Sequence, residues 1–525
     1  MKNEFKEHPL DCVQNILRRY ITRFDCVLFA VAYIATLLVH LYMFTHKFIN
    51  HDDIGALYTR GDYGIYSGRW LIAPLTGVTG YLSSSWLNGI VAAAFLAVAV
   101  VLIVRIFGVR HRVPAVLMAV CLVSFPVIAS TYTYMCGAVP YMFALCAAVC
   151  GAWLIRSEKL PLMAVGSIAI ALAMGCYQSY FCLAVVILVV TIGLDLLDNR
   201  FEGSWKRIFL TGVKYVFFLA VGMVLYFIIL KICLHVKHVG LVSYQGLDTM
   251  GQLSFDQMIQ RIKDAYRGFY NFFTNKENRF HGFFVWLVAA DVIFTLSAIV
   301  IKVKKMRTWR SPATMIFLAL IIILFPLASG LMYVMVDSST ASVHLVMMYP
   351  MVMLLLFPAI VLDRLELPAL NAVRWKKSLC AVFAVALLVL QAAIGYECIL
   401  ITNRAYFAMD ITYENTYAFY TKLAAKLELQ DGYTPETPVA FIGRAKIKEY
   451  APPAQVMGAL NVNSALNMYT VPYFLKYLVA SEYKFVSPEQ ETEISALQEF
   501  QEMPVYPAEG SIATINGVIV VKFSG

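Results

Sequence analysis

The feature that most constrains this chain is a series of apolar runs, each long enough to cross a lipid bilayer. A helix needs about 20 apolar residues to span roughly 30 Å of hydrocarbon, and lipid forces the backbone to satisfy its hydrogen bonds internally. Eleven runs meet or approach this length, near residues 26–46, 86–107, 113–130, 138–155, 160–176, 180–197, 209–230, 281–301, 312–331, 345–362 and 378–398. The sequence therefore predicts an α-helical polytopic membrane protein with about 11 transmembrane helices.

The composition excludes an array of soluble domains. The 525 residues are 60% hydrophobic and 14% charged, whereas a soluble chain has about 45–50% apolar and about 25% charged residues. So few charges cannot cover that much apolar surface in water, which makes membrane lipid the expected main solvent. The net charge of +9 would suggest nucleic acid in a soluble protein. Here many of the basic residues lie between spans, and we expect no nucleic-acid partner.

The Lys and Arg residues indicate which way the chain crosses the membrane. They gather in the N-terminal segment and in every second short connection, whereas the intervening short connections near 131–137, 177–179 and 332–344 contain none. Because short basic connections stay cytoplasmic, we expect a cytoplasmic N-terminus and, with an odd number of spans, an extracytoplasmic C-terminus. Residues 1–23 show no cleavable signal pattern, so the first run is expected to remain as an anchor.

The eleven Cys residues indicate neither a disulfide framework nor a zinc site. They are scattered, several lie inside apolar runs, and no CxxC pair occurs. Buried Cys behaves as a small hydrophobic residue, and we interpret these residues in that way.

Three long segments are expected on the outer side, at 47–85, 231–280 and 399–525. In the second, a capping box of Ser254 and Gln257 predicts the start of a helix. Its apolar face consists of Phe255, Met258, Ile259, Ile262, Tyr266, Phe269 and Phe273, opposite Asp256, Gln260, Arg261, Lys263 and Arg267. Such a helix is expected to lie in the membrane interface, with a piece of an ordinary outer domain as the alternative.

The third segment has the composition of a small soluble domain. Residues Tyr413 to Leu429 have a helical pattern, and Pro438 to Gly443 form a predicted strand that ends at a turn. Asn516-Gly517 between two apolar stretches is a strong hairpin signal. We therefore divide the chain into a transmembrane part, 1–398, and an extracytoplasmic α/β domain, 399–525.

Two adjacent carboxylates follow the first span, in the run His51-Asp52-Asp53-Ile54. Acids just above the bilayer are costly unless they are capped, paired or used. One of them near a hydroxyl group could act as a general base or help to hold a metal. The alternative is that Asp52 or Asp53 caps a short helix that starts at Ile54.

The motif Gly68-Arg69-Trp70 lies later in the same outer segment. Arg69 could reach lipid head groups beside an interfacial Trp70, or it could bind a substrate phosphate through two parallel hydrogen bonds. Residue type alone favours neither. Tyr177 and Gln178, at the outer end of two short spans, suit sugar hydroxyls because both side chains donate and accept hydrogen bonds. Aromatic-belt and helix–helix contacts are the alternatives.

The remaining polar candidates have weaker signals. Asp291 falls in the middle of the eighth span, where an ionisable residue is a functional candidate, and we expect it to be neutral or hydrogen-bonded inside the bundle. Residues where the last span ends could line an outer cavity or cap the junction: Glu397, Asn403 and Arg404. Lys231 begins the second long outer segment and could hold a phosphate or anchor the chain. Asp337 and His344 suit a plain loop role.

Several of these motifs together resemble those of the bacterial O-antigen glucosyltransferase II family. They are the acidic pair after the first span, Gly68-Arg69-Trp70, Tyr177-Gln178, and the tail motifs Tyr506-Pro507 and Gly510-Ser511-Ile512. The family belongs to the GT-C glycosyltransferases, which are polytopic enzymes of the membrane. The resemblance extends over nearly the whole chain, although each motif is short.

The resemblance implies an inverting hexosyltransferase of the bacterial plasma membrane. Its donor would be a polyprenyl-phosphate sugar, and its acceptor a hydroxyl of a cell-surface glycan: O-antigen, teichoic acid and other wall glycans all fit. Glucose as the donated sugar follows from the family name alone. By position, Asp52 or Asp53 would be the general base and Arg69 would bind the donor phosphate, helped by Lys231 and Arg404. The residues that would contact sugar or acceptor are His51, Trp70, Tyr177 and Gln178.

A divalent cation such as Mg²⁺ or Mn²⁺ is compatible with this chemistry but not required by it. Basic side chains can stabilise a monophosphate leaving group in its place, so we assign no metal ligand.

Two other functions compete with glycosyl transfer. A lipid-linked glycan flippase or another transporter predicts charged residues at mid-bilayer depth and broken helices in paired halves. Asp291 is the exception in a sequence whose ionisable residues otherwise lie outside the spans or at their ends. A non-catalytic surface protein whose tail binds a partner is the third possibility, and it leaves the acidic pair and Gly68-Arg69-Trp70 unexplained.

Overall fold

The computed structural model describes residues 18, 20–46, 50–56, 64–242, 255–275, 280, 282–336, 343–365, 374–445, 447 and 470–524, and the statements below concern these residues. Helices dominate the fold. In the bundle they are α2 (Arg23–Val39), α3 (Leu41–Thr45), α6 (Ser85–Ile106), α7 (Arg112–Ser124), α8 (Pro126–Tyr132), α9 (Ala138–Ile155), α10 (Leu160–Cys176), α11 (Tyr180–Leu197), α12 (Trp205–Lys237), α14 (Gly282–Lys305), α15 (Pro312–Ser329), α17 (Phe357–Asp363) and α18 (Arg374–Glu428).

Among the described residues, seven helical segments are long and apolar enough to cross a membrane, which indicates a membrane protein. They correspond to α6, to η3 (Met135–Gly137) together with α9, and to α11, α12, α14, α15 and most of α18. The pair α7 and α8 makes an eighth if its 44° bend is one broken span. The break falls at Phe125, whose extended backbone precedes Pro126, because proline lacks an N–H group and disfavours a helical residue before it.

Each of the eleven predicted runs contains helical residues, but four are shorter or interrupted. The first is divided at His40 between α2 and α3, the third is divided at Phe125 between α7 and α8, and the fifth is the 17-residue α10. The tenth consists of η5 (Leu345–Met347), η6 (Tyr349–Leu356) and α17. The polytopic helical fold is therefore as predicted, and the count of eleven spans stays a prediction.

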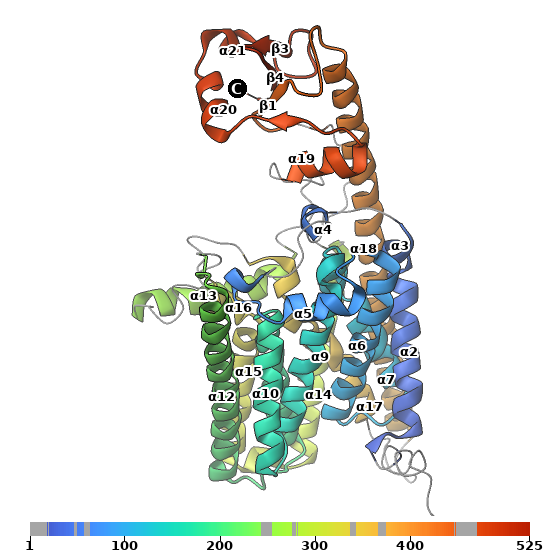
Figure 1. Ribbon diagram of the computed structural model, residues 1–525. Coiled ribbons are helices and arrows are strands. Elements are labelled where there is room, and N and C mark those ends of the chain that lie inside the picture. The colour runs from blue at the N-terminus through green and yellow to red at the C-terminus, as the bar shows by residue number, and fades with distance from the viewer. Residues whose placement is uncertain are drawn as a thin grey trace, which may run out of the picture.

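The helices form an elongated bundle with a small sheet beyond one end (Figure 1). We call this the sheet end, and the opposite end, where α2 begins, the N-terminal end. Short elements lie near the sheet end of the bundle: α4 (His51–Ala56), α5 (Ile72–Thr76), α13 (Phe255–Phe273) and α16 (Met332–Met335). By contrast, α17 lies near the N-terminal end.

The predicted amphipathic helix is present as α13, which extends across the bundle near its sheet end (Figure 1). The predicted polar face, which includes Arg261, is not wholly exposed. Arg261 is buried and donates to the Val334 carbonyl at 3.3 Å, because α13 packs on α16 through Gly268, where a Cβ would meet the Tyr333 ring at 2.3 Å. Ser254 of the predicted capping box lies outside the described residues, and the interfacial placement stays a prediction.

The C-terminal part contains a four-stranded sheet in the order β2-β1-β4-β3. Its strands are β1 (Pro438–Ile442), β2 (Lys484–Phe485), β3 (Ile512–Ile515) and β4 (Val518–Lys522). The predicted strand at 438–443 and the Asn516-Gly517 hairpin are both confirmed: β3 and β4 pair antiparallel, and both turn residues have positive φ. Short helices accompany the sheet, namely α19 (Val471–Phe474), α20 (Pro488–Ser495) and α21 (Gln498–Glu502).

One helix joins the two parts of the chain. The predicted helix at 413–429 is the last portion of α18, a continuous helix of 55 residues that also contains the eleventh run. Its final turns place Tyr420, Leu423 and Leu427 in the core beneath the sheet. The predicted division between residues 398 and 399 therefore falls inside a helix.

Close packing of α9, α10 and α12 sets the geometry of the sheet end. A Cβ at Gly151 of α9 would lie 3.0 Å from the Gly166 carbonyl oxygen of α10, and the reverse contact is equally short. On the other side of α10, Ser167 donates to the Phe218 carbonyl of α12 at 2.7 Å. Small residues allow such close approach of helix backbones, so the side chains at the ends of these helices have fixed relative positions.

Candidate functional site

The acidic pair lies in the first turn of α4, and Asn50 caps this helix. The Asn50 side-chain oxygen accepts from the backbone N–H groups of Asp52 and Asp53 at 2.7 and 3.0 Å. Its amide donates in turn to the Thr133 carbonyl. The alternative that Asp52 or Asp53 caps a helix starting at Ile54 is therefore wrong, because the helix starts three residues earlier, at His51.

Asp53 is buried, with 1% of its surface exposed. One carboxylate oxygen accepts from the backbone N–H of Cys136 at 2.7 Å, and Ser83 supplies a further hydrogen bond. Burial raises the pKa of the Asp53 carboxyl above its ordinary value, although the bonds from Cys136 and Ser83 oppose this effect. Asp53 thus ties α4 to η3, which lies directly before α9.

Asp52 is the more accessible acid, with 35% of its side chain exposed. Its carboxylate lies 3.4 Å from Nε2 of His51, whose side chain is 16% exposed. The two neighbouring acids therefore differ in environment: Asp53 is enclosed and hydrogen-bonded to the backbone, and Asp52 is partly exposed beside an imidazole.

Arg69 is presented by a tight loop that docks on the end of α10. Gly64 and Gly68 both have positive φ, at +88° and +78°, a conformation that favours glycine. The loop closes through a bond from the Arg69 N–H to the Gly64 carbonyl at 2.9 Å. Leu71 then donates to the Gly175 carbonyl at 2.8 Å, and the Trp70 ring occupies the space that a Cβ at Gly175 would need, at 2.5 Å.

The Arg69 guanidinium lies among aromatic side chains. Its central carbon is 4.8 Å from the centre of the Tyr177 ring, a cation–π distance, and one of its nitrogens is 3.5 Å from the Tyr141 hydroxyl. The Tyr141 and Tyr177 rings are 4.9 Å apart. Arg69 is only partly buried, so the protein holds its position while part of the side chain stays accessible.

Gln178 holds the same loop in place through hydrogen bonds. Its amide donates to the Ser67 carbonyl at 3.0 Å and to the Tyr226 hydroxyl at 3.1 Å. Tyr226, on α12, donates to the Gly68 carbonyl at 3.1 Å. Tyr177 is 4% exposed. The structure therefore brings Tyr177 and Gln178 to Arg69, where both support its loop, and their predicted contacts with a sugar stay a prediction.

Tyr141, at the start of α9, connects the acids with the arginine. It lies within electrostatic reach of Asp52 as well as Arg69 and Tyr177, and it follows the η3 turn to which Asp53 is bonded. Sequence reasoning missed Tyr141, Cys136 and Asn50. Tyr141 gave no clear signal because a tyrosine at the end of an apolar run resembles an aromatic-belt residue. Asn50 could have been found, because Asn directly before a helix is a typical helix-capping residue.

Lys231 and Arg404, predicted as further phosphate ligands, are both exposed, on α12 and on α18. These helices lie on opposite sides of the bundle (Figure 1), and the phosphate roles of the two residues stay predictions. No contact of either side chain with a described residue joins it to Arg69. By contrast, His51, Trp70, Tyr177 and Gln178 all belong to the group around the acids and Arg69.

The other polar candidates have local roles in the structure. Asp291 is fully buried and accepts from Thr295 at 3.1 Å, as expected of a hydrogen-bonded group inside the bundle. Asn403 donates to the Val39 carbonyl at the end of α2 at 3.4 Å. Asp337 lies outside the described residues. Within the described part of the chain, no three His, Cys, Asp or Glu side chains gather as a metal ion would require.

Comparison with known proteins adds one finding. The family model described as Glucosyl transferase GtrII matches residues 41–355, a range that includes α4, the Arg69 loop, Tyr141, Tyr177 and Gln178. No curated protein and no solved structure matches the chain.

Proposed function

The chain belongs to the GtrII glucosyl transferase family, and on that premise we propose that it transfers a hexose, glucose by the family's description, from a polyprenyl-phosphate-linked donor to a hydroxyl of a cell-surface glycan. The apolar helices support a donor with a hydrocarbon carrier, because such a carrier partitions into the bilayer in which these helices lie. The enzyme is an inverting GT-C transferase of the bacterial plasma membrane in this proposal.

The observation that carries the proposal is the meeting of an acidic pair and an arginine around Tyr141. Group transfer from a phosphate needs a base for the incoming hydroxyl and positive charge for the departing phosphate. Asp52 and Arg69 offer these groups at the sheet end of the bundle, where Arg69 lies 3.5 Å from the Tyr141 hydroxyl and Asp52 interacts electrostatically with the same tyrosine.

Asp52 is the base in this proposal. Its exposed carboxylate takes the proton of the acceptor hydroxyl as the acceptor oxygen bonds to the anomeric carbon. The bond from that carbon to the phosphate oxygen breaks, and the polyprenyl phosphate leaves with the electron pair. Attack from the face opposite the phosphate inverts the anomeric centre. Asp53 serves as a positioning residue, because its carboxylate already binds Cys136 and Ser83.

Arg69 stabilises the phosphate as negative charge develops on it. A guanidinium suits this role because it remains charged and presents parallel N–H donors. Contact with Tyr177 and the bonds of Gln178 to the loop hold it in place before the donor arrives, so little ordering is needed on binding. Arg69 is the main phosphate ligand in this proposal, and Lys231 and Arg404 stay predicted helpers.

The proposed outer-face reaction follows from the chain's orientation. We expect the short basic connections to be cytoplasmic, and in this proposal the sheet end of the bundle, with α4 and Arg69, is therefore outside. A lipid-linked sugar that has reached the outer leaflet can approach this end from the bilayer, and a surface glycan can approach it from the aqueous side.

The test is sugar transfer by the purified full chain in nanodiscs, from a radiolabelled glucosyl polyprenyl phosphate to isolated surface glycan. Asp52→Asn is expected to lower kcat by about 10²–10⁴ with little change in the donor KM, because general-base catalysis contributes a factor of this size. Asp256→Asn, an exposed acid on α13, is the matched control and should keep wild-type kcat.

Two results would contradict the proposal. Wild-type kcat in Asp52→Asn would remove Asp52 as the base. Movement of the labelled lipid across a liposome membrane without any transfer to glycan would favour the transport alternative instead.

A further inference from the structure

The short helix that carries the acidic pair contributes to an apolar core at the other end of the chain. This core lies beneath the C-terminal sheet and includes Leu423, Val439, Phe474 and Val521; we call it the C-terminal core. Ile54 of α4 belongs to it and is fully buried, with 0% of its surface exposed. Among the described residues of this core, Ile54 is the one member that precedes residue 413. A residue of the first outer segment therefore completes the core of the C-terminal part.

The C-terminal core is tied to the bundle, because α18 belongs to both. Phe474 of α19 packs among three rings of α18, at centre-to-centre distances of 5.8–6.3 Å: Tyr413, Tyr417 and Tyr420. These tyrosines lie on the same continuous helix that extends through the bundle. Helix α4 packs against α19, and Figure 1 shows α4 between the end of the bundle and α19. The surface that receives α4 is thus held in place by α18.

Helix α4 needs such contacts because it is short. It has six residues, whereas isolated helices of fewer than about 12–15 residues are marginal in water. Asn50 and Asp53 bind backbone groups at the end of the bundle, and Ile54 contacts the C-terminal core. Two separate parts of the chain therefore hold the helix that carries the acids.

These two contacts set the direction of Asp52. Successive residues of an α-helix are about 100° apart around its axis. The side chains of Asp53 and Ile54 therefore leave α4 on adjacent faces, one bound to the bundle and the other to the C-terminal core. Asp52 leaves the helix about 200° from Ile54, on the side away from the C-terminal core, and its side chain is 35% exposed. With two adjacent faces bound, α4 cannot turn about its axis.

We propose that Ile54 is a positioning residue for sugar transfer, and that the C-terminal part of the chain takes part in the reaction by holding α4 through this side chain. The inference rests on the proposed function, in which Asp52 is the base. A base must lie within hydrogen-bond reach of the proton that it takes. Without the Ile54 contact, α4 turns on the bonds of Asn50 and Asp53, and the Asp52 carboxylate loses its alignment with the acceptor hydroxyl.

The first test compares two variants that remove the same atoms from different cores. Ile54→Ala acts on the C-terminal core, and Ile494→Ala acts on the core at the other face of the sheet. Both should lower Tm, because each deletes buried apolar atoms. Only Ile54→Ala should lower kcat, about 10- to 100-fold, since a small misplacement of a catalytic group has an effect of this size. The donor KM should stay unchanged, because Arg69 belongs to a separate loop.

The kinetics are measured by transfer of labelled sugar with the full chain in nanodiscs. Ile54→Leu conserves the side-chain volume and should keep most of the wild-type kcat, which a lost contact of Ile54→Ala would not. An equal fall of kcat in Ile54→Ala and Ile494→Ala would show a general effect of lower stability and overturn the proposal.

Amide hydrogen exchange of residues 50–56 tests the position of α4 without any transfer reaction. Exchange should become faster in Ile54→Ala and stay at the wild-type rate in Ile494→Ala. An unchanged rate in a folded Ile54→Ala protein would overturn the proposal. So would faster exchange with wild-type kcat, provided that Asp52→Asn has lost activity. Wild-type kcat in Asp52→Asn would instead reject the proposed base, so the two failures are distinguishable.

Discussion

Asp52 and Asp53 are neighbours in the chain, yet their different surroundings suit them to different roles in the proposed reaction. Asp53 is enclosed and bonded to the Cys136 N–H, so it fixes α4 against the turn before α9. Asp52 keeps an exposed carboxylate beside His51. A base must reach its substrate and a positioning residue must not, so we propose Asp52 rather than Asp53 as the base, even though burial raises the pKa of Asp53.

The raised pKa of Asp53 predicts how stability depends on pH. Because burial favours the protonated carboxyl, the folded chain holds this proton more tightly than the unfolded chain does. The contribution of Asp53 to the free energy of unfolding is therefore fully present below the ordinary pKa of 3.8. It is lost as pH rises through the folded-state pKa. Asp53→Asn cannot ionise and keeps an oxygen for the Cys136 N–H. Its Tm relative to wild type should increase between about pH 4 and about pH 7, measured by thermal unfolding in detergent.

The same measurement on Asp52→Asn provides the comparison, because Asp52 lies outside the enclosed site. If the Tm difference between wild type and Asp53→Asn stayed constant over this pH range, the buried carboxyl would not be protonated in the folded chain. Asp53 would then be an ionised group stabilised by its hydrogen bonds.

At the scale of elements, the site depends on the mutual packing of α9, α10 and α12. Gly151 and Gly166 bring α9 against α10, and Ser167 bonds α10 to α12. These contacts carry Tyr141, Tyr177 and Tyr226 toward the Arg69 loop from three separate helices. A shift of one helix would therefore move a support of Arg69 without touching Arg69 itself.

Gly175 offers a test of this dependence. A Cβ at Gly175 would lie 2.5 Å from the Trp70 ring, so Gly175→Ala must displace Trp70 and with it the adjacent Arg69. We expect the donor KM to rise about tenfold, in the direction of Arg69→Ala, because one charge-assisted contact contributes about 1.5–3 kcal/mol. Steady-state transfer kinetics with varied donor check this.

Gly212→Ala on α12 is the control, because no atom lies within 4 Å of a Cβ at that position. It should leave the donor KM unchanged. An unchanged KM in a folded Gly175→Ala protein would mean that Trp70 moves without disturbing the phosphate ligand.

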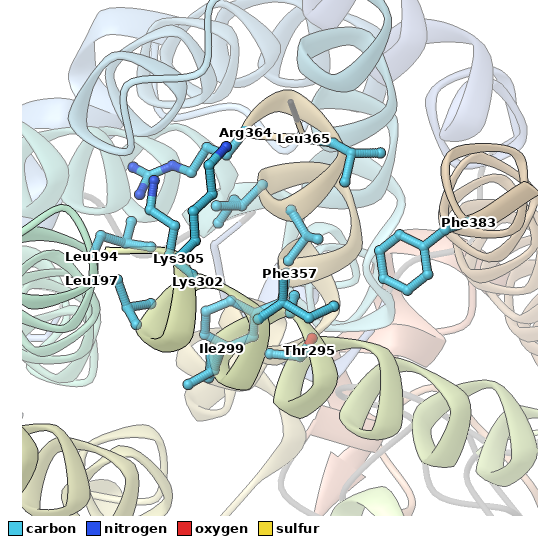
Figure 2. Close-up of a pocket in the computed structure, with 14 residues that line it drawn as sticks. Leu194, Leu197, Thr295, Ile299, Lys302, Lys305, Phe357, Arg364, Leu365 and Phe383 are labelled. Atoms are coloured by element: carbon cyan, nitrogen blue, oxygen red, sulfur yellow. The ribbon is translucent and has the colours of Figure 1, made fainter. Parts of the chain in front are cut away.

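At the scale of the whole molecule, the two ends of the bundle have different chemistry. The sheet end holds the acids, Arg69 and the tyrosines, and the N-terminal end holds a mostly apolar cavity between α11, α14, α17 and α18 (Figure 2). The continuous helix α18 extends from the N-terminal end to the core beneath the sheet. The C-terminal sheet is thus held beyond the end that carries the proposed transfer site.

The prediction at the scale of the whole molecule concerns the orientation of the chain across the membrane. Because the C-terminus is expected outside, alkaline phosphatase fused after Gly525 should be active in intact bacteria. Green fluorescent protein fused at the same position should not fluoresce, because it would be exported in unfolded form. The same reporters fused before Met1 serve as the reciprocal control. The reverse pattern would place α4 and Arg69 in the cytoplasm and contradict outer-face transfer.

The sequence by itself determined the helical membrane fold, the Asn516-Gly517 hairpin and the glucosyl transferase family, because apolar length, turn chemistry and short motifs are local properties. It also located Asp52, Asp53 and Arg69. Tertiary structure alone decided which acid is buried and that Tyr177 and Gln178 support the Arg69 loop. It also brought Tyr141 into the site and made the cavity from four helices. These features depend on which side chains meet across helices that are distant in sequence. The residue pattern along a single apolar helix does not identify the helix against which it packs.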